Sequence, residues 1–453
     1  MRGCAVICIF LLLCCAPMYA TPARIIGMGF LDLIVDDESN RLNLFDYGRN
    51  IAGLYRDERG STVYTSIAYG TVKQSDSGGA LESEITYWGV ALLSETSMMV
   101  STLSRFPGVP IGAVVTYRME DRLAISGSGL YSKTTTHSES AQRTEEASWP
   151  IGGVAFSRKL GVLDVGARGE YTMISISNNQ GDLAVNGSLK LLEGGVAANL
   201  SPMLDIGVSA GFGFPDAGFT LSNVENNFSG NSVSAGLQGI LSVPGLLKVG
   251  AKFDFFNANL SGETTYGNVT INIGDISLTD FSFGSRLLFS SILFPLKAGL
   301  SIDYKTTHPQ FDGEDLSFLD YDYTQSSTHI GTGMSYAMPF LTPGIQYTLL
   351  NENISDNLDN GETVNSSRWD LRFGGEARLT VLSLRAGYII SRHDPNTGTD
   401  DDEFKGRSIT VGTGLQIPLQ PFKVEIAFVN QQTNPEDYRE TENSLSAVFK
   451  MRF

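Results

Sequence analysis

The sequence predicts an all-β protein, a transmembrane antiparallel up-and-down β-barrel of about 14 to 18 strands with an N-terminal plug segment. Three observations lead to this class. The chain begins with a secretory leader, it alternates apolar and polar residues without helical periodicity from Thr62 onward, and its last strand ends on an aromatic residue. The leader sends the chain out of the cytoplasm, and the alternation gives each extended segment one apolar and one polar face.

Residues 1–23 have the composition of a signal peptide. Arg2 precedes an apolar run from Ala5 to Ala16, and all 4 cysteines of the chain lie in this region. The run is too short to span a bilayer as a helix, and no later stretch approaches about 20 unbroken apolar residues. We expect cleavage after Ala23, which leaves a mature protein without cysteine. The alternatives are cleavage after Ala20 and lipidation at Cys14 or Cys15.

The charge balance restricts the partners. Loss of Arg2 with the signal leaves 31 basic residues against the 49 acidic ones, a net charge of −18 compared with −17 for the full chain. Such a surface repels nucleic acid and offers no polybasic patch to anionic lipid. The negative charge could bind cations, or it could simply keep the protein soluble.

Short apolar or Pro/Gly connectors alternate with longer polar ones, at a spacing of about 40 to 50 residues. Phe106–Gly108, Lys159–Gly161 and Val243–Gly245 are short connectors, whereas Pro215–Gly230 and Asn257–Asn272 are long polar ones. Each unit is therefore one hairpin with a short and a long end, as in transmembrane barrels, whose short turns face the periplasm. A β-propeller would place four strands and its own motif in each repeat. About 18 strands follow, and 16 or 14 remain open because Glu84–Leu103 could hide another turn.

The alternation assigns the two faces of the wall. In the segment from Asp370 to Thr380, Leu371 and Phe373 share one face, whereas Arg372 and Glu376 share the other. One face is too charged for a sheet covered on both sides, so we expect lipid outside and a polar lumen inside. A soluble sandwich with its charged face in water is the alternative. The predicted lumen charges are Arg372, Glu376, Arg378, Arg385, Lys423, Glu425, Lys450 and Arg452.

The closing strand, Ser444–Phe453, carries its apolar residues at every second position. This ending resembles the last strand of bacterial outer-membrane barrels, which typically finishes on phenylalanine with apolar residues two and four positions earlier. The resemblance assigns Phe449, Met451 and Phe453 to an assembly signal. Because a barrel joins its last strand to its first, we expect this strand to pair with Thr62–Gly70.

The segment from Arg24 to Gly60 breaks the alternation, yet it is too apolar for a periplasmic spacer and needs shelter in the barrel mouth. Three stretches, Gly27–Gly29, Asp36–Asp37 and Asn50–Leu54, resemble the N-terminus of the FadL-like superfamily of outer-membrane proteins. That superfamily includes long-chain fatty acid and hydrocarbon transporters and PorV-type secretion proteins. The resemblance implies a plug role for Asn50, Ala52 and Gly53. Ile51 stands where the family has proline, and family barrels have fourteen strands.

Candidate catalytic and metal-binding residues are few. Of the 4 histidines, those at 137, 308 and 393 fall in predicted loops, and His329 lies near a strand start. His393 with Asp394 is the sole pair of catalytic type, and a solvated turn explains it better. The acidic stretches Asp394–Glu403 and Asp356–Glu362 lack the spacing of an EF-hand, which leaves at most adventitious divalent binding. We therefore expect no enzyme, no cofactor and no dedicated metal site.

The sequence thus predicts a cell outer-membrane protein for passive transport of small hydrophobic or amphipathic compounds. Two alternatives remain open: a general polar porin, favoured by the mixed lumen charge, and a non-transporting surface or secretion partner of the PorV type. The expected partners are outer-membrane lipid, the barrel assembly machinery and a small hydrophobic substrate. No nucleic acid is expected.

Overall fold

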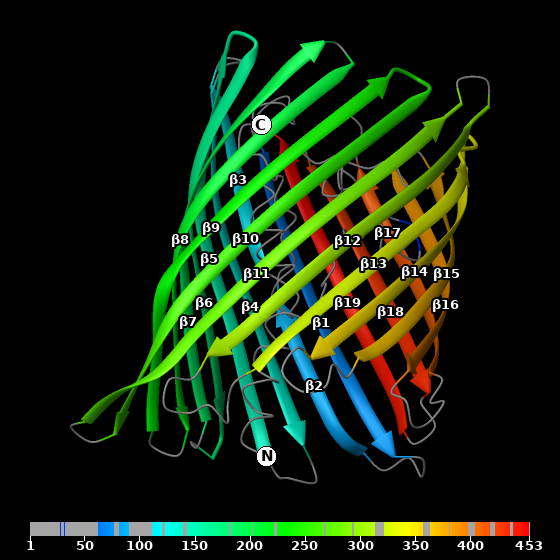
Figure 1. The fold of residues 1–453 in the computed structure, drawn as a ribbon. Coiled ribbons are helices and arrows are strands. Elements are labelled where there is room, and N and C mark those ends of the chain that lie inside the picture. Colours follow the sequence, from blue (N-terminus) through cyan, green and yellow to red (C-terminus); the bar gives the residue numbers. More distant parts are fainter. Residues whose placement is uncertain are drawn as a thin grey trace.

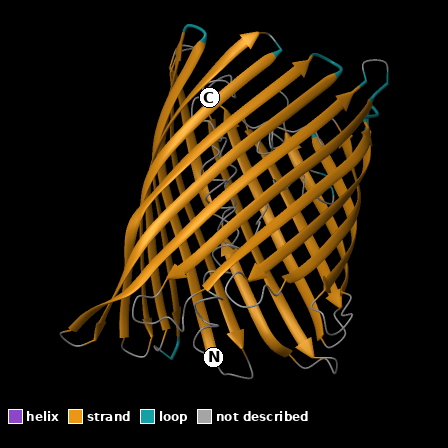
Figure 2. Ribbon diagram, viewed as in Figure 1, coloured by secondary structure: helices purple, strands orange, loops and turns teal. Residues whose placement is uncertain are grey.

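A computed structural model describes Met28, Leu31 and most of residues 62–452 of the chain. The gaps in the second range are 77–80, 90–110, 120–122, 139–142, 181–182, 202, 222–223, 267–268, 292–293, 313–320, 357–362, 380, 397–403, 417–421 and 435–437. Within the described residues the regular structure is entirely β-strand (Figure 2). The predicted signal peptide, residues 1–23, lies outside the described residues.

The strands are long and lie side by side in one sheet that curves into a barrel (Figure 1). Their bounds are β1 Thr62–Asp76, β2 Leu81–Gly89, β3 Ile111–Met119, β4 Leu123–Ser138, β5 Arg143–Leu160, β6 Leu163–Asn178, β7 Leu183–Ser201, β8 Leu204–Leu221, β9 Val224–Val243, β10 Leu247–Tyr266, β11 Val269–Ser290, β12 Leu296–Asp312, β13 Tyr321–Tyr336, β14 Leu341–Asp356, β15 Thr363–Leu379, β16 Leu382–Asn396, β17 Phe404–Gln416, β18 Phe422–Asn434 and β19 Tyr438–Arg452. From β3 to β19 each strand pairs antiparallel with the next along the chain.

The first and last strands are joined. β19 pairs antiparallel with β1 along its whole length, from Arg452 opposite Thr62 to Tyr438 opposite Asp76. The predicted pairing of the C-terminal strand with Thr62–Gly70 is therefore confirmed, with Gly70 opposite Ser444. Every described strand thus has a paired neighbour on both sides, which satisfies the backbone hydrogen-bonding groups that lipid cannot satisfy.

β2 and β3 share one position in the wall. β2 pairs with the second half of β1 and with the end of β4, whereas β3 pairs with the first half of β1 and with the beginning of β4. The 19 strands therefore occupy eighteen positions, because two of them lie end to end. The predicted range of strand numbers holds. Of the segment Glu84–Leu103, only residues 84–89 are described, as the end of β2, and residues 90–110 lie outside the described part of the chain.

The long polar connectors were wrongly predicted as loops over most of their length. Pro215–Gly230 lies mainly in β8 and β9, which leave only residues 222–223 between them, and Asn257–Asn272 lies mainly in β10 and β11. His137, His308 and His393 lie in β4, β12 and β16 for the same reason. Toward these ends the outer face becomes polar, so the strands lose the lipid-facing apolar alternation by which they are recognised, although their backbone ladder continues.

The two faces of the wall differ in exposure from one residue to the next. Ile409 and Thr410 in β17 are 53% and 0% exposed, and Leu300 and Ser301 in β12 are 43% and 3% exposed. Large apolar side chains stand on the outer face along the strands, while the inner face holds buried polar and charged ones. An apolar exterior around a polar interior is the arrangement of a barrel in lipid. The chain is therefore an outer-membrane β-barrel.

The two ends of the barrel are distinct. We name the apolar end after its turns, which expose Val162, Phe294 and Phe340 to 74%, 65% and 74%. The polar end carries the polar strand extensions and the other set of connectors. The C-terminus of β19 lies at the apolar end, beside the start of β1 (Figure 1).

We expect a charge on the outer face to destabilise the barrel according to its depth. Leu300→Arg in β12 should lower the free energy of unfolding by about 2–4 kcal/mol, because lipid does not solvate the guanidinium group. Urea unfolding of the protein refolded into phospholipid vesicles measures this value. Gln310→Arg is the matched control on the same face of β12 near the polar end, and equal destabilisation by both variants would contradict the lipid assignment.

Candidate functional site

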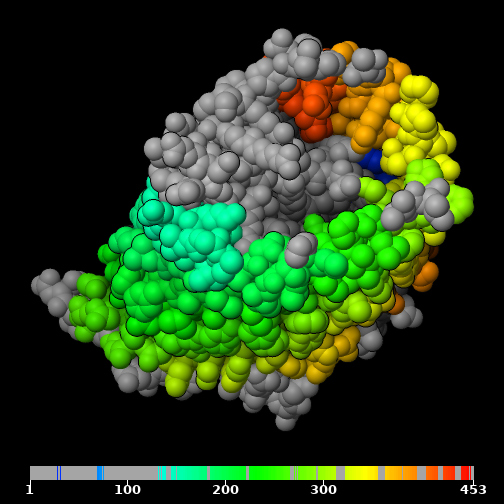
Figure 3. Space-filling view, turned by 90° about the horizontal axis from the view of Figure 1, so that it is seen from above, coloured from blue at the N-terminus to red at the C-terminus, as the bar shows by residue number. Residues whose placement is uncertain are grey.

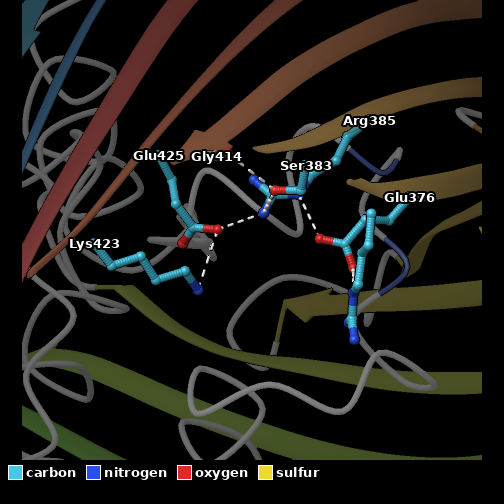
Figure 4. Close-up of polar contacts among 7 residues, drawn as sticks. Glu376, Ser383, Arg385, Gly414, Lys423 and Glu425 are labelled. Atoms are coloured by element: carbon cyan, nitrogen blue, oxygen red, sulfur yellow. Dashed lines mark hydrogen bonds and ion pairs between the residues drawn. The ribbon is translucent and has the colours of Figure 1, made fainter. Parts of the chain in front are cut away.

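The interior of the barrel holds a chain of ion pairs that crosses four strands (Figure 4). Arg385 on β16 lies at its centre. Its Nε donates to Glu376 Oε1 on β15 at 3.0 Å, and its Nη2 donates to Glu425 Oε1 on β18 at 2.5 Å. The three side chains are between 1% and 6% exposed. A cation held between two carboxylates, each bound by a charge-assisted hydrogen bond, is a strong arrangement away from water.

Two further cations extend this chain, which we call the lumen ion network. Arg378 Nε donates to Glu376 Oε2 at 2.6 Å, and Lys423 Nζ lies 3.2 Å from Glu425 Oε1. Their side chains are 56% and 28% exposed, so the network runs from its buried centre toward more open space at both ends. Positive and negative groups alternate along it, and three cations face two carboxylates.

A glycine in the intervening strand makes this reach possible. Gly414 on β17 lies opposite Ser383 of β16 and Glu425 of β18. A Cβ atom at Gly414 would lie 2.6 Å from Ser383 Oγ and 2.8 Å from Arg385 Nη2. The guanidinium of Arg385 therefore crosses the backbone of β17 to reach a carboxylate two strands away. Any larger residue at 414 would push it back.

The N-terminal segment lies against the same wall. Met28 and Leu31 are 1% and 0% exposed. Gly374 belongs to the lumen face of β15, two residues before Glu376, and a Cβ atom there would overlap the carbonyl oxygen of Met28 and lie 3.1 Å from Leu31 Cδ1. Met28 and Leu31 therefore lie inside the lumen, against β15. The predicted plug residues Asn50, Ala52 and Gly53 lie outside the described residues.

Other buried charges are distributed round the lumen. On β6 and β7, Arg168 pairs with Glu193, with side chains 3% and 5% exposed. On β15, Asp370 accepts from Arg368 Nε at 3.1 Å and from Arg372 Nη2 at 2.9 Å. The polar interior is therefore stabilised by local pairs rather than by one sign of charge. Seen along its axis, the wall surrounds a hollowed interior (Figure 3).

An apolar cluster interrupts this polar lining at the polar end. Phe228, Ile276 and Phe311 form a buried cluster at 5%, 6% and 8% exposure, with Ala217, Phe219 and Leu260 packed against it. Phe219 and Phe228 stack with ring centroids 6.0 Å apart. Residues that lie opposite each other on paired strands are on the same face of the sheet, as Ala217 is with Phe228 and Ile276 is with Phe311. We call these six residues the mouth cluster.

The mouth cluster faces the lumen rather than the lipid. In β8 the exposed residues Phe212 and Phe214 stand at even positions, so Ala217 and Phe219 stand on the opposite face. Sequence reasoning missed the cluster because most of its residues fell in predicted polar connectors: Ala217, Phe219 and Phe228 in Pro215–Gly230, and Leu260 in Asn257–Asn272. The signal that could have revealed it was the presence of phenylalanines, Phe219, Phe228 and Phe311, in otherwise polar stretches.

The remaining predicted residues have these positions. Arg372 belongs to the ion pairs of β15, while the side chains of Lys450, Met451, Arg452 and Phe453 lie outside the described residues and Phe449 is half-buried on β19. His393 and Asp394 are consecutive in β16 and point to opposite faces, so they form no catalytic pair.

Most of the two acidic stretches considered for calcium, residues 357–362 and 397–403, is not described. The described residues hold no group of three or more metal-ligating side chains, and they include no helix long and apolar enough to cross a bilayer.

Comparison with known proteins gives similarity of fold alone. No protein-family model matches the chain, and no curated protein sequence matches it. Among solved structures, the toluene transporter TodX of Pseudomonas putida is similar at 9% identity and a TM-score of 0.39, covering 98% of this chain and 100% of that one. A FadL homologue of Pseudomonas aeruginosa is 10% identical at a TM-score of 0.42, covering 96% and 98%. The ferric citrate transporter FecA is 8% identical at 0.44, covering 86% and 78%.

We expect removal of the central cation to destabilise the barrel more than removal of the outer one. Arg385→Met leaves each of two buried carboxylates with only its more exposed cation and should lower the free energy of unfolding by about 3–5 kcal/mol. Arg378→Met removes an exposed partner of the same Glu376 and should cost about 1 kcal/mol or less. Urea unfolding in vesicles measures both, and equal values would show that Arg385 is not the centre of the network.

Gly374→Val should displace the N-terminal segment, because the side chain would occupy the space of the Met28 carbonyl group. A unique thiol at Leu31→Cys reports this, since all 4 native cysteines lie within the first fifteen residues. We expect slow reaction with a water-soluble maleimide in the parent and fast reaction after Gly374→Val. Gly375→Val is the control, because its Cβ would make only ordinary contacts of 3.5 Å and longer. Slow labelling in all three proteins would contradict the contact.

Proposed function

We propose that this barrel carries small hydrophobic or amphipathic compounds passively across the outer membrane. The mouth cluster is the observation that carries the proposal. The cluster makes this part of the inner wall apolar, and an apolar solute is better accommodated beside it than beside paired charges. A compound that enters from the polar end meets this patch before it meets the charged pairs deeper in the barrel.

The expected strength of capture suits passive transport. A small ligand that buries about 150 Å² of apolar surface gains about 4 kcal/mol, at about 25 cal/mol per Å². Because association also costs translational and rotational freedom, this gain corresponds to a Kd of about 1 mM or weaker. Such a compound is concentrated at the mouth but is not trapped there, so it can move on down its concentration gradient.

The N-terminal segment serves as the plug in this proposal. Met28 and Leu31 lie against Gly374, close to the lumen ion network, and the resemblance of Gly27–Gly29 and Asn50–Leu54 to the FadL-like superfamily supports the same role. A plug that blocks water and ions while yielding to an apolar solute distinguishes such a channel from an open pore.

A polar porin is the second candidate, and the mixed charge of the lumen favours it. The alternation of Arg378, Glu376, Arg385, Glu425 and Lys423 would line a weakly selective aqueous path if the N-terminal segment left room. Planar-bilayer conductance of the mature protein and of a form without residues 24–60 separates the candidates. We expect small currents from the former and larger ones from the latter. Large steady currents from both indicate a porin, and none from either indicates a non-transporting surface protein.

Uptake of a hydrophobic dye into vesicles tests the mouth cluster directly. Phe228→Ser should reduce the initial rate about threefold or more, because loss of the phenyl ring removes apolar contact surface from the centre of the cluster. Ile389→Ser is the matched control, an apolar lumen residue on β16 that is 7% exposed and lies outside the cluster. Equal loss in both variants would contradict capture at the mouth cluster.

A further inference from the structure

The outer face of β13 to β17 changes character abruptly toward the polar end. Tyr347 on β14 and Trp369 on β15 stack on this face with ring centroids 6.4 Å apart. Toward the apolar end the face continues with Phe373 and Tyr388, which are 38% and 39% exposed. Aromatic side chains of this kind mark the level at which hydrocarbon gives way to lipid headgroups. What lies beyond Tyr347 and Trp369 on the same face is therefore at headgroup level.

A polar cavity opens at that level. Its volume is about 380 Å³, and hydroxyl, amide and carboxyl groups dominate its lining. Thr328, Asn351, Ser367 and Asp394 line it from four successive strands, and each lies opposite the next in register. Asn351 directly follows the outward alternation of Tyr347, so these side chains share the lipid-facing side of the wall. The hydroxyl and amide groups of this lining can bind the hydroxyl groups of a sugar, and the carboxylates of Glu352 and Asp394 can accept hydrogen bonds from them.

Three exposed cations adjoin the cavity. Arg392 on β16 lies opposite both Trp369 and Lys405, and Arg407 on β17 lies opposite Ile390. Arg407 Nη2 also donates to Gln432 Oε1 at 3.0 Å on the neighbouring strand β18, which fixes the guanidinium at the surface. On the outer face of β16 and β17 toward the polar end, these three cations stand beside one described carboxylate, that of Asp394. Charge complementarity therefore selects an anion at this place.

We propose that this part of the outer wall binds the headgroup of a phosphorylated glycolipid of the outer leaflet. Arg392, Lys405 and Arg407 hold the phosphate groups, and the cavity holds the adjoining sugar. The acyl chains continue along the apolar wall below, past Ile390 and Tyr388. The position at the bilayer edge favours a lipid over a free polysaccharide, because only a lipid occupies the cations, the cavity and the apolar wall together. The proposal depends on the membrane location and not on the transported compound.

Binding of a phosphorylated rough lipopolysaccharide to the detergent-solubilised barrel tests this inference. We expect the double variant Lys405→Ala/Arg407→Ala to bind it about tenfold more weakly, and the binding of the parent to fall as salt is raised. The control is Arg158→Ala/Lys159→Ala, which removes one arginine and one lysine exposed at the apolar end of β5. Both barrels should migrate on gels as folded proteins before heating, which separates lost binding from lost fold.

Two further ligands distinguish the parts of the headgroup. A dephosphorylated preparation of the same glycolipid should bind the parent weakly, and the cation variants should not weaken it further. Asn351→Leu/Ser367→Leu should weaken both preparations, because it fills the cavity with apolar groups. Phosphatidylglycerol vesicles supply phosphate without the sugar. The proposal is overturned if they bind as well as the glycolipid, if dephosphorylation has no effect, or if the control variant loses as much binding as the cation variant.

Discussion

The backbone hydrogen bonds of a sheet in lipid must all be made within the protein, and most of this structure follows from that requirement. An unpaired edge in hydrocarbon costs several kcal/mol for each exposed group, so the last strand has to meet the first. β19 does so with β1 over the whole length of both. The requirement also explains why β2 and β3 divide one position in the wall. Together they supply a neighbour to both halves of β1, and neither half keeps a free edge.

Once the wall is continuous, its two faces have separate tasks. The outer face meets hydrocarbon and accepts apolar side chains at every second position, whereas the inner face can hold charge only where the charge is paired. The centre of the lumen ion network shows the consequence: Arg385 is bound on both sides by carboxylates, and the glycine at 414 leaves space for it to reach the second one. Pairing of this kind holds the lumen side chains in place and leaves the lumen lining without a large net charge.

Both proposals rest on exceptions to this division. The mouth cluster is apolar on the wet face, and the cations with the polar cavity are hydrophilic on the lipid face. Both features lie at the polar end. There the strands extend beyond the hydrocarbon layer, so lipid does not determine whether the side chains on either face are polar or apolar. An apolar solute entering the lumen and a glycolipid beside the wall would meet different surfaces of the same strand extensions. The plug contact at Gly374 lies deeper, next to the lumen ion network.

Local alternation was enough to predict the barrel class, the lipid and lumen faces of segments such as Asp370–Thr380, and the partner of the closing strand. A side chain's face in a strand depends only on its position along that strand, and a barrel has only one partner for its last strand. The polar strand extensions escaped prediction because their outer face is polar, so the lipid-facing alternation ends before the strands do. The reach of Arg385 to Glu425, the seat of Met28 on Gly374 and the meeting of Phe228 with Phe311 were decided by tertiary structure alone. They join residues from separate strands, and which of these meet depends on register and curvature, which no single segment of sequence contains.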